Sequence, residues 1–446
     1  MQDNNLMSRR RMLKLMGLTT AGVALAACAP AASPSTGGSS DAAAPSAAQK
    51  EMSIATYADP RNEWQRTVSK AWAEANPDVN LNIDEIIYGE MNKKQQAAMA
   101  TDTLWDVSFS GVKWFPYLVA RGAFVALEDL IAANDPDMED FFSASLAGSS
   151  FEGKLYGLPY LMHPGNPALI IFNLNLLGEK GLEPPADNNW TTDEYAQLAT
   201  DAADPDNMVF GTNLFPGNYY DHCSFARTYG GDILDETHEN FTFNVDPASI
   251  EAARWVTDLR TVHRAAPNRA EAEGLQFAAG TMATATLGTY AVRSLEETIA
   301  GSFEYALRLF PNSPEHERGY QAFVECFSVA AQSEYPTEAF DLTVALTSTA
   351  AGIESVLASS NQPTARKSVW TATELEGLLD PIFMDALEWM SEVPGPFPHP
   401  SNLRFQELQD TWANISPDLF YGEVSFEEGM QAVQDACQEI MQLPRP

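Results

Sequence analysis

The chain has 446 residues and a formal net charge of −35, with 61 acidic side chains against 26 basic ones. Such a charge repels nucleic acid and anionic lipid, and beyond the first fourteen residues the sequence has no basic patch of the kind that nucleic-acid binding needs. The length exceeds what one compact core supports and is sufficient for two lobes.

The first 27 residues have the pattern of a signal peptide. Arg9, Arg10, Arg11 and Lys14 form a basic region, and the apolar run that follows is shorter than the roughly 20 residues of a membrane-spanning helix. The residues before Cys28, "LAA", resemble the bacterial lipobox, so we expect cleavage there and lipidation of Cys28. An ordinary signal peptide with a chance "LAAC" is the alternative. The stretch "SRRRMLK" also resembles the twin-arginine export motif, but the general secretion route stays open.

Residues 28–50 are predicted to be the lipidated cysteine and a flexible tether. Positions 29–49 contain no large apolar side chain, so nothing there offsets the entropy of ordering. The pattern predicts a globular protein held by its lipid anchor at the outer face of the cytoplasmic membrane or in the periplasm.

The mature chain begins with alternating strands and helices. Residues 51–58 read as a strand and 59–76 as a helix that ends before Pro77, with Trp64, Val68, Ala71, Trp72 and Ala75 on one face. A strand is expected in 79–87, a helix in 91–101 and a strand in 104–111. This order predicts a parallel sheet, whose ligands bind beyond the carboxyl ends of the strands, at the loops 59–63 and 110–114.

Local signals later in the chain predict two helix starts and a buried thiol. Thr191 with Glu194, and Ser425 with Glu428, have the spacing of capping boxes. Cys437 lies on an apolar helical face, which favours a buried free thiol. With Cys28 lipidated, the remaining cysteines (Cys223, Cys326 and Cys437) allow one disulfide at most, and whether any two pair is left open.

Several segments resemble a known family, the extracellular solute-binding proteins of sugar-type ABC importers (the maltose-binding-protein-like group). The most specific is "FEGKLYGLPYLMHPGNPALIIFNLNLL", similar to the aromatic-x-GK-x-YG-x-P motif and the Tyr-Asn pair that follows it, with Phe172 in place of Tyr. "QFAAGTMATATLGTY", "NQPTARKSV" and the closing "GEVSFEEGMQAVQDACQEIMQ" resemble further family segments, the first with Tyr290 where Trp is common.

The resemblance implies an α/β fold with two lobes, each a mainly parallel sheet flanked by helices, joined by hinge segments. Lobe 1 would comprise 51–160 plus 320–365, and lobe 2 would comprise 161–319 plus 366–446. The implied function is the solute-binding component of an ABC importer, which captures a sugar or oligosaccharide by hinge closure and delivers it to permease subunits. The protein would be a monomer without cofactors.

In the first lobe, ligand contact is predicted for polar and aromatic residues near the strand ends. Asp59, Asn62 and Glu63 are candidate hydroxyl acceptors, with solvated loop or cap roles as the alternative. Trp64 and Trp114 are candidate stacking residues, although Trp64 fits equally well in the core.

In the second lobe, Tyr219, Tyr220 and Asp221 follow a Pro-Gly turn and are candidates, with plain loop packing as the alternative. Tyr290 is a candidate because it matches a family position that often stacks on ligand.

No pattern of catalysis or metal binding is found. The six histidines never fall at metal-ligand spacing, and no nucleophile, Walker or dinucleotide motif occurs. The sequence therefore predicts a binding protein rather than an enzyme. The alternatives are a surface glycoside hydrolase, a sensor that docks on a receptor, or a binding protein for a polyamine or another non-sugar solute.

Overall fold

The computed structural model describes residues 49–59, 62–134, 136–359, 364–378, 380–392 and 399–445. Contacts separate residues 48–446, as one unit, from the first 47 residues. The expected signal peptide, Cys28 and the tether up to residue 48 lie outside the described residues.

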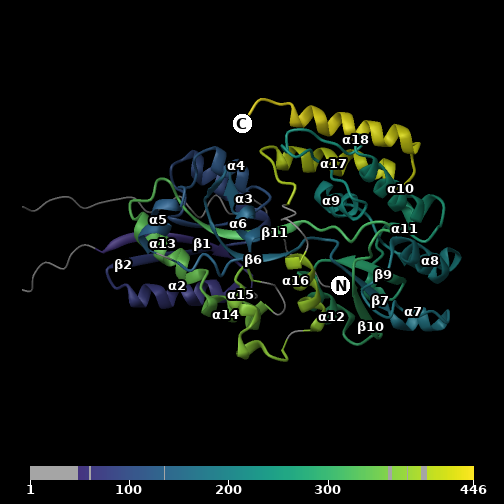
Figure 1. Cartoon of the computed structure of the whole chain (residues 1–446), viewed down its shortest axis with the longest axis horizontal. Helices are drawn as coiled ribbons and strands as arrows, with labels where there is room; N and C mark the ends of the chain where they lie inside the picture. Colours follow the sequence, from purple (N-terminus) through teal and green to yellow (C-terminus); the bar gives the residue numbers. More distant parts are fainter. Residues whose placement is uncertain are drawn as a thin grey trace, which may run out of the picture. The chain divides into compact units, whose positions relative to one another are not determined.

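The first sheet has five strands in the order β2-β1-β3-β11-β6 (Figure 1). Their bounds are β1 (Lys50–Tyr57), β2 (Val79–Ile86), β3 (Val107–Gly111), β6 (Leu158–Pro164) and β11 (Ala322–Val329). β1 pairs parallel with β2 and β3, which confirms the predicted parallel start of the chain. β11 pairs antiparallel with both β3 and β6, so it runs against the other four strands of this sheet, which share one direction. The sheet is mainly parallel, as expected, with one reversed strand.

The second sheet has the order β10-β7-β9-β8, built from β7 (Leu169–Asn173), β8 (Phe210–Thr212), β9 (Met282–Leu287) and β10 (Tyr305–Leu309). Only β8 and β9 pair parallel. β7 follows β6 after four residues without a crossover helix, and it enters between β9 and β10 in the opposite direction. β8, β9 and β10 therefore share one direction, and this sheet is also mainly parallel in strand direction, with β7 as its reversed strand.

The two helices of the first crossovers are α2 (Glu63–Ala75) and α3 (Tyr88–Ala100). Trp64 and Trp72 of α2 are buried, as the predicted apolar face requires. Ala71 and Ala75 of that face are exposed, because the buried stripe of α2 runs instead through Gln65 and Ser69.

Most of the other helices surround the two sheets (Figure 1). They are α4 (Phe115–Ala120), α5 (Glu128–Asn134), α6 (Ser143–Gly148), α7 (Leu174–Glu179), α8 (Thr192–Ala202), α9 (Tyr219–Thr228), α10 (Pro247–Thr261), α11 (Arg269–Ala272), α12 (Val292–Ile299), α13 (Pro336–Leu346), α14 (Thr349–Ser359), α15 (Lys367–Trp370), α16 (Pro381–Glu392), α17 (Phe405–Phe420) and α18 (Phe426–Met441). A two-stranded hairpin is formed by β4 (Ser150–Phe151) and β5 (Lys154–Leu155).

Two separate cores organise these helices. α13 and α14 pack against α2 beside the first sheet, around buried residues such as Phe109 and Phe340. α17 contacts α9, α10 and α18, and Trp412 is the largest fully buried side chain of that core. α16 contacts β6 of the first sheet and β10 of the second. The expected limits of the two lobes stay a prediction.

The local predictions later in the chain hold in most respects. Thr191 and Glu194 form a capping box at α8. The Ser425 hydroxyl accepts from the Glu428 N–H, but the Glu428 carboxylate accepts from that hydroxyl instead of from the backbone. The cysteines of the described part (Cys223, Cys326 and Cys437) are free and buried, and burial raises the pKa of Cys437 to about 12.

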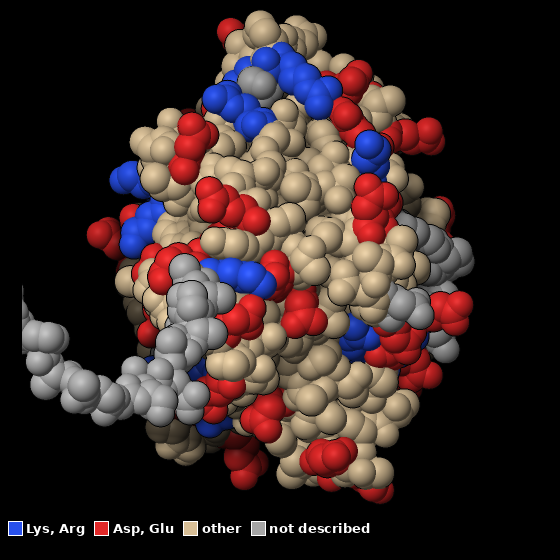
Figure 2. All heavy atoms as spheres, turned by 90° about the vertical axis from the view of Figure 1, so that its left-hand side faces the viewer, with Lys and Arg blue, Asp and Glu red and all other residues tan. Residues whose placement is uncertain are grey.

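Acidic side chains are spread over the face of the molecule shown in Figure 2, interrupted by a few basic groups. Among the described residues, no helix combines the length and apolar character that crossing a membrane needs.

Candidate ligand-binding site

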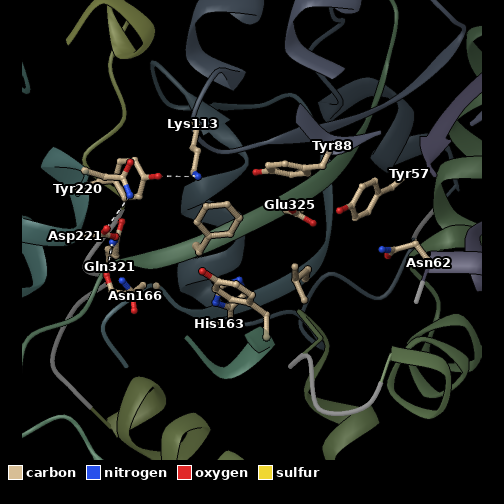
Figure 3. A pocket seen from close by; sticks show the side chains of 15 residues that line it. Tyr57, Asn62, Tyr88, Lys113, His163, Asn166, Tyr220, Asp221, Gln321 and Glu325 are labelled. Carbon is tan, nitrogen blue, oxygen red and sulfur yellow. Dashed lines mark hydrogen bonds between the residues drawn. The ribbon is translucent and has the colours of Figure 1, made fainter. Parts of the chain in front are cut away.

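A cavity of about 270 Å³ lies at the carboxyl ends of β1, β2 and β3, facing the start of α9 and the turn after β9 (Figure 3). Aromatic and polar side chains make up most of its wall. The lining residues are Tyr57, Asn62, Tyr88, Lys113, Leu161, His163, Gly165, Asn166, Asn218, Tyr220, Asp221, Tyr290, Gln321, Phe323 and Glu325.

The parallel strands deliver four of these residues to one edge of the sheet. Tyr57 is the last residue of β1, Tyr88 the first of α3 after β2, and Lys113 follows β3 by two positions. Asn62 precedes α2. The rings of Tyr57 and Tyr88 are 5.5 Å apart in an edge-to-face arrangement. The order of strands and helices in the sequence predicted ligand binding at this edge of the sheet.

β6 and β11 supply the floor of the cavity. The His163 ring of β6 stacks on Phe323 of β11 with centroids 5.0 Å apart. Burial lowers the pKa of His163 to about 4, so the imidazole is neutral at pH 7. The charged groups of the cavity are therefore Lys113 beyond β3, Glu325 of β11 and Asp221 of α9.

The second sheet and its helices supply the opposite wall of the cavity. Asp221, in the first turn of α9, accepts from the Asn218 amide at 2.8 Å. Tyr290, in the turn after β9, is 41% exposed and lies 5.4 Å from the His163 ring. A Cβ at Gly288 would lie 2.3 Å from the Tyr290 ring, so glycine permits this ring position.

Lys113 joins the two walls. Its ammonium donates to the Tyr220 hydroxyl at 3.1 Å and lies 4.6 Å from the Tyr220 ring centroid and 5.2 Å from that of Phe323 (Figure 3). Burial lowers the pKa of Lys113, and the charges of Asp221 and Glu325 oppose this effect.

Two buried carboxylates face the same space. Burial raises the pKa of Asp221 to about 6, against the hydrogen bonds from Asn218 and Asn166 and the charge of Lys113. Burial also raises the pKa of Glu325 to about 7, although the Tyr160 hydroxyl donates to its carboxylate. Both groups therefore titrate near neutral pH.

A wider groove of about 520 Å³ shares Tyr88, Lys113 and Tyr220 with the cavity. It runs between α3 and α17 and is rich in amide side chains, namely Asn92, Gln96, Gln406 and Gln409. The cavity thus has an amide-lined extension on the far side of the Lys113–Tyr220 contact.

The cavity offers rings for stacking together with amide, carboxylate and ammonium groups for hydrogen bonding, which is the chemistry that recognises a polyhydroxylated ring. Within the described ranges, no three His, Cys, Asp or Glu side chains are placed to hold a metal ion.

The sequence profile of a family described as bacterial extracellular solute-binding protein matches residues 67–376, well over half of the chain. The chain belongs to this family of bacterial extracellular solute-binding proteins. Family membership confirms the resemblance noted in the sequence and implies an exported protein.

Distant relatives of this solute-binding protein include the following binding protein. A putative binding protein of Brucella abortus (strain 2308) is 22% identical over 303 residues, which cover 66% of this chain and 71% of the relative.

Solved structures confirm the two-lobed fold. An ABC substrate-binding protein from Listeria monocytogenes, in complex with cycloalternan, has a TM-score of 0.74 and 18% identity and covers 89% of this chain and 100% of its own. The sugar-binding protein MalE from Xanthomonas citri has a TM-score of 0.73 and 18% identity, with 88% and 97% covered. A cyclo/maltodextrin-binding protein complexed with maltotetraose has a TM-score of 0.72 and 16% identity, with 90% and 100% covered.

Of the nine residues predicted to contact ligand, Asn62, Tyr220, Asp221 and Tyr290 line the cavity of this solute-binding protein. They come from both walls, and the structure brings them together around one space.

Three predicted aromatic residues belong to the packed interior instead. Trp64 is 3% exposed in the first core, which was the alternative weighed for it. Trp114 is also buried and donates to Gln95, reaching only the amide-lined groove. Tyr219 is buried and donates to the Pro400 carbonyl, so its ring faces away from the cavity that Tyr220 lines.

Asp59 and Glu63 do not line the cavity either. Glu63 is exposed in the first turn of α2, where it forms an ion pair with Arg66. Asp59 lies in the loop after β1, and its carbonyl accepts from the Asn62 N–H.

Sequence reasoning missed Tyr57, Tyr88 and Lys113 in the first wall. The rule that ligands bind at carboxyl ends of parallel strands could have identified all three, since each ends or directly follows a predicted strand. His163 and Glu325 had no comparable signal, because their strands join the sheet antiparallel and from distant parts of the chain.

Proposed function

We propose that this protein is the solute-capturing component of an ABC importer for a sugar or short oligosaccharide, and not an enzyme. The observation that supports the sugar most directly is the cavity wall, where the rings of Tyr57, Tyr88 and Tyr290 alternate with amides and carboxylates. Sugars present C–H faces that stack on rings and hydroxyls that need short polar partners. Structures of the same fold that are described with bound oligosaccharides add support.

The size of the cavity favours a small ligand. Its volume of about 270 Å³ is at the lower end of the about 300–1,000 Å³ that ligand pockets occupy. One or two sugar rings match this space, and longer chains would extend into the amide-lined groove.

The remaining parts of the proposal come from the sequence. Export by the N-terminal signal, lipidation at Cys28, two lobes divided at residues 161, 320 and 366, a monomeric state and a permease partner all belong to this function. Capture would occur by closure of the lobes on the ligand.

Thermal unfolding of the purified protein against a panel of mono- and oligosaccharides tests the proposal. A ligand at 100 times its Kd stabilises the folded state by about 2.7 kcal/mol. We expect a clear rise in Tm with one sugar class, and we expect the sugar to be recovered intact. Consumption of the sugar would instead identify a glycoside hydrolase.

A pair of variants tests whether the rise in Tm comes from sugar bound in the cavity. Tyr290→Ala removes a partly exposed ring from the wall, so it should weaken sugar binding by about tenfold with little loss of stability. Tyr117→Ala removes a partly buried ring of α4 that does not line the cavity, and should leave binding unchanged. Equal binding by both variants would place the ligand elsewhere.

A further inference from the structure

One buried acceptor in the cavity has no hydrogen-bond donor. Gln321 is 1% exposed, and its Nε2 donates to the Asn166 carbonyl at 3.1 Å, which fixes the orientation of the amide. Its Oε1 lacks a partner within the described residues. Because a buried acceptor left unpaired is destabilising, this atom points to a ligand that donates hydrogen bonds.

The carboxylates that line the cavity outnumber its ammonium group. Asp221 and Glu325 form no ion pair with any side chain of the described ranges. Lys113 is the cation that shares the cavity with them, and its Nζ is directed to the Tyr220 hydroxyl. One ammonium therefore serves two carboxylates, which leaves the cavity with a surplus of negative charge when all three are ionised.

Glu325 is the carboxylate with fewer donors. Asn218 and Asn166 donate to Asp221, whereas Glu325 receives one hydrogen bond, from Tyr160. Figure 3 shows Glu325 near Tyr57 and Tyr88, on the side of the cavity away from Asp221. That side combines a carboxylate with two aromatic rings, and the Tyr88 hydroxyl there has no partner among the described residues.

We propose that the ligand of this cavity carries a positively charged amino group, as an amino sugar does, and that Glu325 holds this group. This inference rests on the proposed function as a sugar-binding protein. An ammonium brings three hydrogen-bond donors and a positive charge to Glu325, which receives a single hydrogen bond, while Gln321 on the Asp221 side would accept from a hydroxyl of the same ligand (Figure 3). The faces of Tyr57 and Tyr88 add cation–π attraction.

The rest of the wall favours an amino sugar over a polyamine. Lys113 lies beside Tyr220 on the opposite side of the cavity from Tyr57 (Figure 3) and repels a second ammonium, which an extended polyamine would place there. Asn62 and Asn166 offer partners to uncharged hydroxyls. The net charge of −35 raises the concentration of a cationic solute around the protein, whatever its shape.

Isothermal titration of the purified protein with matched sugars tests the inference. Glucosamine, galactosamine, mannosamine and the β-1,4 disaccharide of glucosamine are compared with glucose, galactose, mannose and cellobiose. N-acetylglucosamine is the ligand control, because it keeps the nitrogen without the charge. We expect the amine to bind about tenfold tighter than its neutral parent and its acetylated form, the ratio of a charge-assisted to a neutral hydrogen bond.

Two variants then assign the preference to Glu325. Glu325→Gln should abolish the preference for the amine, so that the amine and its neutral parent bind with the same affinity. Glu90→Gln, the matched control, removes an exposed carboxylate of α3 that does not line the cavity, and should keep the preference. If Glu325→Gln fails to fold, Asp221→Asn serves to test whether the preference belongs to the second carboxylate, which would overturn the assignment to Glu325.

The outcomes separate this inference from the proposed function. Neutral sugars that bind as tightly as the amines overturn the inference and leave a sugar-binding protein. Binding of spermidine without binding of any sugar overturns both. The absence of binding by every sugar of the panel overturns the proposed function, and the inference with it.

Discussion

At the scale of single residues, the buried carboxylates of the cavity predict an unusual pH dependence. Burial raises the pKa of Glu325 from 4.5 to about 7, so the folded protein holds a proton there that the unfolded chain has released. The contribution of this group to stability therefore falls as pH rises from about 4.5 to 7. Glu325→Gln removes this loss, and its stability relative to the parent protein should rise by about 2–3 kcal/mol between pH 5 and pH 8.

Chemical denaturation of both proteins at the two pH values measures this difference. The variant has to be compared with the parent protein because other groups also change stability with pH. Burial lowers the pKa values of His163 and His222 to about 4 and about 3, and these groups change stability in the opposite direction to Glu325. Unfolding lets these imidazoles take up protons below about pH 6.5, so they reduce stability as pH falls. If the difference in free energy of unfolding between the two proteins does not change with pH, Glu325 ionises normally.

Some residues of the cavity could be predicted from the sequence and others could not. Tyr220, Asp221 and Tyr290 were found because they follow turn or family signals, and Asn62 because it follows a strand end. Tyr219 was chosen on the same turn signal as Tyr220, yet neighbouring positions at the start of α9 point in different directions, one into the core and one into the cavity. Side-chain direction at a helix start depends on packing that a single sequence does not display.

At the scale of elements, the close contact of α8 with β8 gives a sharp prediction. A Cβ at Gly211 of β8 would lie 1.8 Å from the Ala199 carbonyl oxygen of α8. Because that atom belongs to a helix backbone, Gly211→Ala should push α8 off the sheet at a cost of about 3 kcal/mol or more in the free energy of unfolding. Gly178→Ala is the matched control, since nothing lies within 4 Å of the added methyl group in α7. It should be neutral or stabilising by about 0.5–1 kcal/mol.

Thermal and urea unfolding of the two variants test the contact. Equal stability of both would mean that α8 shifts freely against β8 and that the interface is loosely packed.

Predictions at this scale succeeded where the signal was local. The alternation of strands and helices from 51 to 111 and the capping box at Thr191 depend on neighbouring residues, and the structure confirms both. The direction of β11 and β7 depends on partners far away in the chain, and the sequence did not predict that these two strands run against the others of their sheets. A buried strand such as β7, apolar along most of its length, has the same appearance in either direction.

At the scale of the whole molecule, the charge of −35 predicts a stability that depends on salt. Acidic groups outnumber basic ones and lie scattered over the face that Figure 2 shows, so their mutual repulsion weakens the folded state. Added NaCl shortens the screening distance from about 30 Å at 0.01 M to about 10 Å at 0.1 M, and Tm should rise over this range. Sucrose at equal osmolality serves as the uncharged control, and an equal rise with sucrose would point to solvent exclusion instead of screening.

The hydrogen bond from Lys113, beyond β3, to the Tyr220 hydroxyl of α9 joins elements of both sheets, and we predict that it stabilises the closed form of the protein. Tyr220→Phe keeps the ring under the ammonium but removes the acceptor, so it should weaken the contact by about 1 kcal/mol, roughly a fivefold change in the ratio of closed to open molecules. Small-angle X-ray scattering should then show a larger radius of gyration for the unliganded variant than for the unliganded parent protein. Saturating ligand should restore the parent value, because ligand contacts made only in the closed form compensate for the lost hydrogen bond. Tyr117→Phe, outside the cavity, controls for loss of a tyrosine hydroxyl. Identical radii for the parent protein and Tyr220→Phe, with and without ligand, would show that this hydrogen bond does not govern closure and that the ligand alone sets the distance between the walls.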